Sequence, residues 1–72
     1  MSVSYKKLWH LLIDRDMKKK DLQNEANLTS HAMRRLSRDE DVTTDTLAKI
    51  CRCLGCKVDD IMEVVELDEN EL

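Results

Sequence analysis

A run of hydrogen-bond donors in the middle of the chain is the feature best suited to do chemistry. Five polar or basic side chains fall on one face at helical spacing: Ser30, His31, Arg34, Arg35 and Arg38. Guanidinium groups pair with phosphate and can donate two hydrogen bonds to guanine. A solvated surface is the alternative explanation of such a charge run. The spacing favours a helix that offers its polar face to an anion.

The elements around this run are predicted to be two short helices joined by a tight turn. The segment 18–27, KKKDLQNEAN, forms a helix anchored by Leu22 and Ala26, and Asn27 terminates it in the left-handed conformation. Thr29 then caps a helix over about 30–37, whose inward residues are Ala32, Met33 and Leu36. This arrangement is typical of proteins that insert the second helix into the DNA major groove.

Apolar periodicity predicts three further helical segments. The first covers about 5–15, with its apolar residues at Tyr5, Leu8, Trp9, Leu12 and Ile13. Another starts at the N-cap Thr43 and ends at Gly55, with a buried stripe of Leu47, Ile50, Cys51 and Leu54. A last helical turn, VDDIM, packs Val58 and Ile61. The segment MEVVEL can form a short strand that pairs with VSY at the start, within the chain or across a dimer.

Length and composition predict one domain of the all-α class. The 72 residues include one Gly, no Pro and two aromatic residues, which favours helices over a sheet. We expect a domain over 1–66 and an acidic, frayed tail over 67–72. Residues 1–57 carry all 12 basic and 8 of the 15 acidic residues, a net charge of +4, while 58–72 carry the other seven acidic residues. This asymmetry suggests that the body meets an anion.

Other classes of function find little support in the sequence. No Gly-rich phosphate loop or nucleophile with a His and acid partner is recognisable, so we predict no enzyme and no cofactor. The thiols of Cys51, Cys53 and Cys56 lack a nearby histidine to complete four ligands, so no metal is expected, and a redox role stays open. No apolar run could span a bilayer and no signal peptide is recognisable, so we expect a cytoplasmic protein that does not bind membranes.

Two consecutive motifs carry a family resemblance. The segment KKKDLQNEANLTSHAMRRLS resembles the helix-turn-helix of the phage-repressor-like, Cro/CI-type (XRE) family of transcriptional regulators. The following VTTDTLAKICRCLGCKVDDIMEV is similar to that family's next segment, a capped helix ending in LG and a short helix with the pair Asp60 and Ile61. The opening VSYKKLWHLLIDRDMKKKDL resembles small, stand-alone members. The resemblance covers roughly 5–64 and implies a five-helix, lambda-repressor-like domain.

The resemblance also implies DNA-contacting positions. It places Lys19 on phosphate and gives the DNA-facing positions of the second helix as Thr29, Ser30, His31, Arg34 and Arg35. With helical geometry added, we expect base contacts from Ser30, His31, Arg34 and Arg35, and phosphate contacts from Lys18, Lys19, Thr29 and Arg38. The sequence departs from the family at Gln23, where Ala is common, and at Lys18 and Lys57, where Ser or Thr usually caps. The acidic residues 39–41 would repel a nearby DNA backbone.

We therefore expect a sequence-specific double-stranded DNA-binding regulator, in particular a repressor. Because one helix covers few base pairs, a homodimer on a pseudo-palindrome is expected, without an evident small-molecule effector. The dimer interface would be VSY, MEVVEL or the exposed edge of Trp9. One alternative is an antitoxin-like or phage-element protein-interaction module on the same fold, whose acidic end engages a basic partner. A monomeric structural or redox-responsive protein is the other.

Overall fold

Four α-helices and a pair of short strands make up the structure, a computed structural model that describes residues 2–65. The order along the chain is β1 (Ser2–Ser4), α1 (Lys6–Asp14), α2 (Lys19–Glu25), α3 (Ser30–Ser37), α4 (Thr44–Leu54), a 3-10 turn (Val58–Asp60) and β2 (Glu63–Val65). The expected acidic tail over 67–72 lies outside the described residues. The all-α expectation is confirmed for residues 6–60, and the strands β1 and β2 flank this helical part in the sequence.

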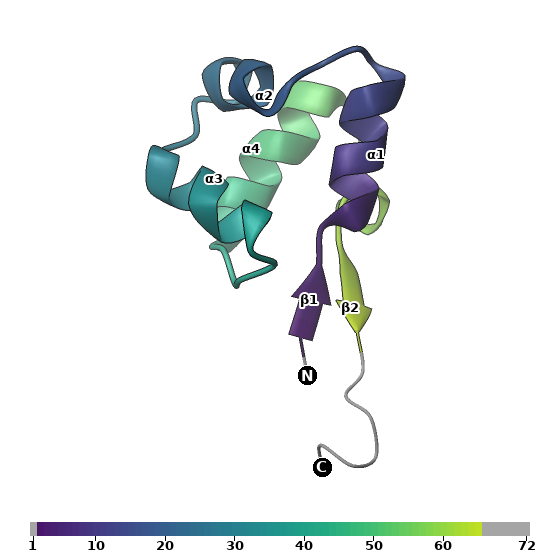
Figure 1. Ribbon diagram of the computed structural model, residues 1–72, viewed down its shortest axis with the longest axis vertical. Coiled ribbons are helices and arrows are strands. Elements are labelled where there is room, and N and C mark those ends of the chain that lie inside the picture. The colour runs from purple at the N-terminus through teal and green to yellow at the C-terminus, as the bar shows by residue number, and fades with distance from the viewer. Residues whose placement is uncertain (1, 66–72) are drawn as a thin grey trace.

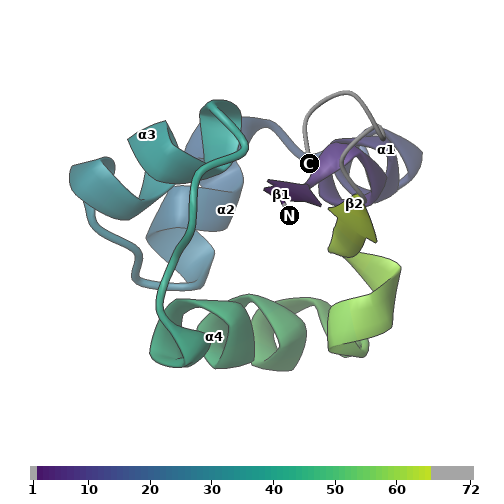
Figure 2. The ribbon, with the colours of Figure 1, turned by 90° about the horizontal axis from the view of Figure 1, so that it is seen from below.

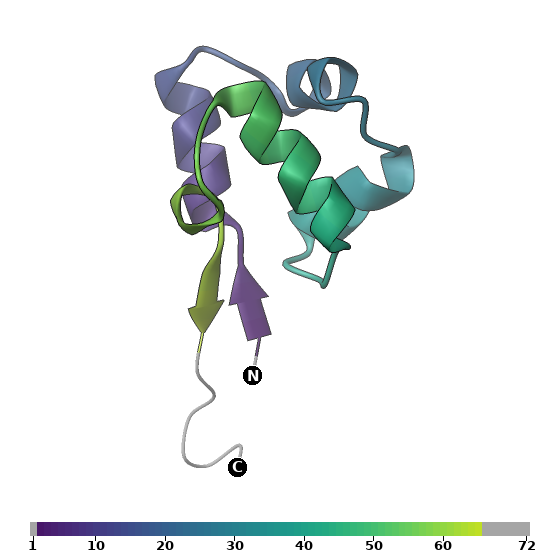
Figure 3. The same ribbon diagram turned by 180° about the vertical axis from the view of Figure 1, so that it is seen from behind.

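The helices enclose one small core. Figure 1 shows α1 and α3 on opposite sides of the molecule with α4 behind them, and α4 comes to the front in the reverse view of Figure 3. Seen from below, α4 runs along one side and faces the other three helices (Figure 2). The buried apolar side chains of the described residues are Tyr5, Leu8, Leu12, Leu22, Ala26, Leu28, Met33, Leu36, Ile50, Leu54 and Ile61.

All four helices end in the same way. The backbone turns left-handed just after each helix, at Asp16, Asn27, Asp39 and Gly55. In each case the next N–H donates to the carbonyl five residues back, as in the bond of 2.9 Å from Leu28 N to Gln23 O. Asn27 and Gly55 confirm the sequence prediction, whereas the two aspartates were not anticipated in this role. Asp and Asn tolerate this conformation better than most residues with a side chain.

Apart from α1, the helix starts follow two patterns. The predicted caps are confirmed, since the hydroxyl of Thr29 accepts from Ala32 N at 3.0 Å and that of Thr43 accepts from Thr46 N at 3.2 Å. Lys18 precedes α2 without a hydroxyl to offer, and its own N–H donates to the Asp21 carboxylate at 2.9 Å. Lys57 uses Asp60 in the same way. The carboxylate three residues on thus satisfies a backbone donor at both atypical caps.

The prediction of a fifth helix is not confirmed within the described residues, although the expected last helical turn is present. The segment after α4 forms a single 3-10 turn, in which Ile61 N donates to Val58 O at 3.0 Å. Between Gly55, which ends α4, and Glu63, which begins β2, the chain has room for one tight turn only. Ile61 is fully buried as predicted, but Val58 is 41% exposed because it opens the turn at the surface.

The buried face of α1 is also narrower than predicted. Tyr5, Leu8 and Leu12 are buried, whereas Ile13 is 71% exposed. Ile13 lies in the last turn of α1, a further 100° around the helix from Leu12. The buried stripe therefore follows Leu8 and Leu12, and Ile13 lies beyond its edge.

The strand pair forms within the chain, one of the two possibilities that the sequence left open. The strands β1 and β2 are antiparallel, with Ser2 opposite Val65, Val3 opposite Val64 and Ser4 opposite Glu63. The pair extends away from the helical body, below α1 in Figure 1. It brings the two ends of the described chain together.

Candidate nucleic-acid interface

The helix α3 directs one side into the core and the opposite side into solvent. Met33 and Leu36 are buried and Ala32 is half-buried. At 100° per residue, the positions opposite this side belong to His31, Arg34 and Arg38, and the structure leaves all three side chains exposed. Thr29 and Ser30, at the start of the helix, are exposed as well. The expected outward face is therefore present, and α3 presents it over its full length.

One flank of α3 is attached to α2. The amide of Gln23 donates to the hydroxyl of Ser30 at 3.4 Å, and the ammonium of Lys19 donates to the hydroxyl of Ser37 at 3.4 Å. Gln23 is the residue that departs from the family pattern of a small Ala. In this fold its longer side chain reaches the start of α3, at one of the expected base-contacting residues. These bonds help to fix the angle between α2 and α3.

The other flank of α3 is attached to the loop that follows it. Arg35 is half-buried, and its guanidinium donates from Nε to Nε2 of His31 at 3.0 Å and from Nη1 to the carbonyl of Asp41 at 3.1 Å. Arg35 therefore differs from Arg34, for which the described residues provide no hydrogen-bond or ion-pair partner. Sequence periodicity alone placed both arginines outward.

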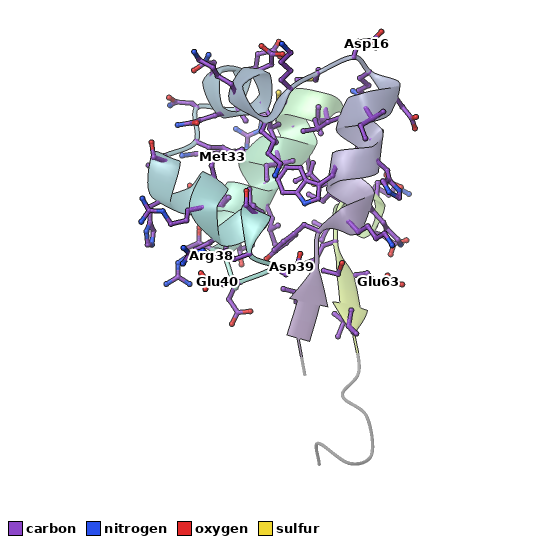
Figure 4. All side chains as sticks on the ribbon, viewed as in Figure 1. Asp16, Met33, Arg38, Asp39, Glu40 and Glu63 are labelled. Atoms are coloured by element: carbon purple, nitrogen blue, oxygen red, sulfur yellow. The ribbon has the colours of Figure 1, made fainter. Side chains whose placement is uncertain are left out.

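The acidic loop at 39–41 is tied to the start of α1. The carboxylate of Asp39 accepts from the backbone N–H of Tyr5 at 3.0 Å, and the buried Tyr5 hydroxyl donates to the carbonyl of Glu40 at 2.8 Å. Burial, together with the nearby carboxylates of Asp41 and Asp39, raises the pKa of the Tyr5 phenol. Figure 4 shows Asp39 and Glu40 at the end of α3 that faces the start of α1. Of the three acidic side chains, that of Asp39 therefore stabilises the fold directly through its bond to Tyr5 N.

The two expected phosphate-binding lysines have different surroundings. Lys18 and Lys19 are both exposed at the start of α2. The ammonium of Lys19 lies 4.3 Å from the centroid of the Trp9 ring, in addition to its contact with Ser37. This cation–π contact was not foreseen, because Trp9 and Lys19 belong to different helices. No pattern along a single helix could have shown it.

A hollow of about 590 Å³ borders α3 on the flank of Arg35. Side chains from α3, from the loop after it and from the first turns of α4 line it, among them His31, Arg35, Val42, Thr46 and Lys49. It is continuous with the exposed side of His31. The hollow leaves that flank of α3 accessible beside the polar face.

The cysteines show no feature of a metal centre. Cys51, Cys53 and Cys56 are free thiols and half-buried. Burial raises the pKa of Cys53 and of Cys56, which disfavours the reactive thiolate at neutral pH. Within residues 2–65, no group of three or more His, Cys, Asp or Glu side chains is arranged to hold a metal ion.

Among the described residues, no helix has the length and apolar character needed to cross a bilayer.

Comparison with known proteins gives the decisive observation. The family described as "Cro/C1-type HTH DNA-binding domain" matches residues 7–66. The chain belongs to this family. The crystal structure of the transcriptional regulator VanUg, Form II, is similar to this Cro/C1-type domain with a TM-score of 0.84 and 44% sequence identity, over 86% of this chain and 83% of that chain. No curated protein matches the chain. Within the Cro/C1-type domain, α2 and α3 are the two helices of the helix-turn-helix.

Proposed function

We propose that this Cro/C1-type domain is a sequence-specific transcriptional repressor that reads its operator with α3 in the major groove. The exposed face of α3, with His31, Arg34 and Arg38 opposite the side that packs on the core, carries the proposal. A major groove admits a helix with its side chains, and arginine can donate two hydrogen bonds to guanine. The likeness to a transcriptional regulator of 44% identity supports the same function. A domain seated in this way over a promoter would block polymerase sterically.

The proposed contacts divide into two groups. Ser30, His31, Arg34 and Arg35 contact base edges, and Lys18, Lys19, Thr29 and Arg38 contact the phosphate backbone. Among the base-contacting residues, Arg34 extends freely, while Arg35 must leave His31 and the Asp41 carbonyl before it can reach a base. We therefore assign the larger share of direct readout to Arg34.

A homodimer is part of the proposal. One recognition helix covers only a few base pairs, so two copies on a pseudo-palindrome would place their α3 helices about one DNA turn, roughly 34 Å, apart. Each strand of the β1–β2 pair has one edge that is unpaired within the described residues, and Val64 and Val65 are exposed there. These edges are candidate interfaces. Trp9 is half-buried beside Lys19, which makes its ring a weaker candidate.

The decisive experiment is selection of binding sites from a random double-stranded DNA pool at near-physiological salt. We expect a palindromic motif to be enriched, to be lost with Arg34→Ala and to be retained with Arg52→Ala. The Arg52 variant is a matched control, because it removes the same charge from an exposed position on α4. Operator binding should then silence a promoter in a purified transcription assay.

Other outcomes would contradict parts of the proposal. Enrichment of a motif without symmetry would refute the homodimer but leave the sequence reader in place. No enrichment by the folded wild-type protein would refute specific readout. The interaction-module alternative would then be favoured, and the seven acidic residues of 58–72 would be tested for binding to a basic partner.

A further inference from the structure

The ammonium of Lys19 lies where three helices meet. Its side chain begins in the first turn of α2, its Nζ lies 4.3 Å from the centroid of the Trp9 ring on α1, and the same Nζ donates to Ser37 Oγ at the end of α3. Trp9 itself packs against the core from a half-buried position. The ring is thus a fixed platform for the lysine. The adjacent Lys18 and Lys20 have no such platform within the described residues.

The groups that hold Lys19 orient its charge without neutralising it. An aromatic face and a hydroxyl carry no net charge, whereas a carboxylate would cancel the ammonium. The ion pair found within residues 2–65 joins Lys49 and Asp45 on α4, and Lys19 has no acidic partner there. A cation held in this way keeps its attraction for an anion. It also has less rotamer freedom to lose when it binds one.

We propose that Trp9 and Ser37 are positioning residues that hold Lys19 ready for a phosphate of the DNA backbone. This inference rests on the proposed DNA-binding function and adds two residues to it, neither of which contacts DNA in the proposal. Trp9 makes the larger contribution, because a cation over an indole face is the stronger of the two contacts and the hydroxyl lies at the long limit of a hydrogen bond. The effect is independent of DNA sequence, since phosphates are common to all sites.

A double-mutant cycle in DNA binding tests the proposal. Dissociation constants are measured over a range of salt for the selected operator and for an unrelated duplex, with wild type, Trp9→Leu, Lys19→Ala and the double variant. Trp9→Leu should weaken binding to both duplexes by about 2- to 5-fold. Lys19→Ala should weaken both alike and lower the salt slope by about 0.9. The Trp9→Leu effect should disappear in the Lys19→Ala background.

Matched variants separate positioning from general damage to the fold. In a Lys20→Ala background, which removes the adjacent charge of α2, the Trp9→Leu effect should persist in full. Trp9→Phe, which keeps an aromatic face, should recover most of the affinity, and Ser37→Ala should weaken binding by less than Trp9→Leu. Thermal unfolding of every variant fixes a temperature at which all are folded. If Trp9→Leu does not fold, Ser37→Ala, which removes the other contact of the Lys19 ammonium, completes the cycle with Lys19→Ala.

The failures of this inference and of the proposed function are distinguishable. If the wild-type protein binds DNA but the effects of Trp9→Leu and Lys19→Ala simply add, Trp9 does not act through Lys19 and the inference is overturned. If folded wild-type protein shows no salt-dependent DNA binding at all, the proposed function fails, and the positioning role fails with it.

Discussion

The helix α3 and the loop that follows it carry opposite charges and are used in opposite ways. The exposed basic face of α3 includes Arg34 and Arg38, which extend into solvent. The acidic loop is instead held against the protein through the Asp39 carboxylate and the backbone carbonyls of Glu40 and Asp41. A run of charges in a sequence therefore does not reveal whether it serves recognition or the fold. The hydrogen-bond partners of each charged residue show which of the two roles it has.

The largest expected effect comes from a buried residue on the inward side of α3. Met33 is buried on the inward side of α3. Met33→Asp would place an unpaired charge in the core, which costs several kcal/mol and is comparable with the whole stability of a domain this small. We expect loss of the helical circular-dichroism signal at room temperature. A folded Met33→Asp variant would contradict the assignment of a single core beneath α3.

The next effect separates the two adjacent arginines. Arg34→Ala should cost about 1–3 kcal/mol in operator binding and relax the preference at one base position, with no loss of stability. Arg35→Ala should also lower the free energy of unfolding by about 0.5–1.5 kcal/mol, because its bonds to His31 and to the Asp41 carbonyl are lost. Urea unfolding and binding measured on the same samples give both quantities. Equal stability of the two variants would argue against a structural role for Arg35.

Asp39 in the acidic loop and Asp16 after α1 both have a left-handed backbone conformation, so the same substitution can be compared at the two positions. Asp39→Gly relieves backbone strain but loses the carboxylate that accepts from Tyr5 N, so we expect a net destabilisation of about 1 kcal/mol or less. Asp16→Gly relieves similar strain, at φ of 55°, and should be neutral or stabilising. Thermal unfolding measures both. Stabilisation by Asp39→Gly as well as by Asp16→Gly would show that the Asp39 carboxylate does not support the fold.

The smallest effect concerns pH. The pKa of Tyr5 is raised in the folded protein from its ordinary value of 10.0, because the folded state favours the neutral phenol. The contribution of the neutral phenol to stability is therefore complete below pH 10 and is lost as pH rises through the higher folded pKa. Wild type should therefore lose more stability than Tyr5→Phe in this alkaline range. Urea unfolding of both proteins at neutral pH and above pH 10 makes the comparison, and equal losses would contradict burial of the phenol against the loop.

Local signals made the helices predictable. Thr29 and Thr43 cap α3 and α4 as expected, and Asn27 and Gly55 end α2 and α4 as expected, because each of these motifs involves residues within a few positions of one another. The outward positions of His31, Arg34 and Arg38 also follow from helical periodicity alone. Both the helix-turn-helix and most of its exposed face could therefore be predicted from the sequence.

Contacts between distant segments could not be predicted in this way. Tyr5 meets Asp39 and Glu40 across more than 30 positions, and Trp9 meets Lys19 across a turn between helices. Periodicity describes one element at a time and contains no information on what lies opposite. The same limit explains why Arg35 was predicted to be outward, since the loop that engages it folds back only after the left-handed turn at Asp39.

The pairing of β1 with β2 has a consequence for the order of folding. Ser2 and Val65 are the two most distant described residues in the sequence, and they are partners in the strand pair. Closing so long a loop is entropically costly, whereas the turns between successive helices close short loops. We therefore expect the helices to assemble first and the strands to join last. A substitution that weakens the pair, such as Val64→Ala, should speed unfolding while leaving the folding rate almost unchanged.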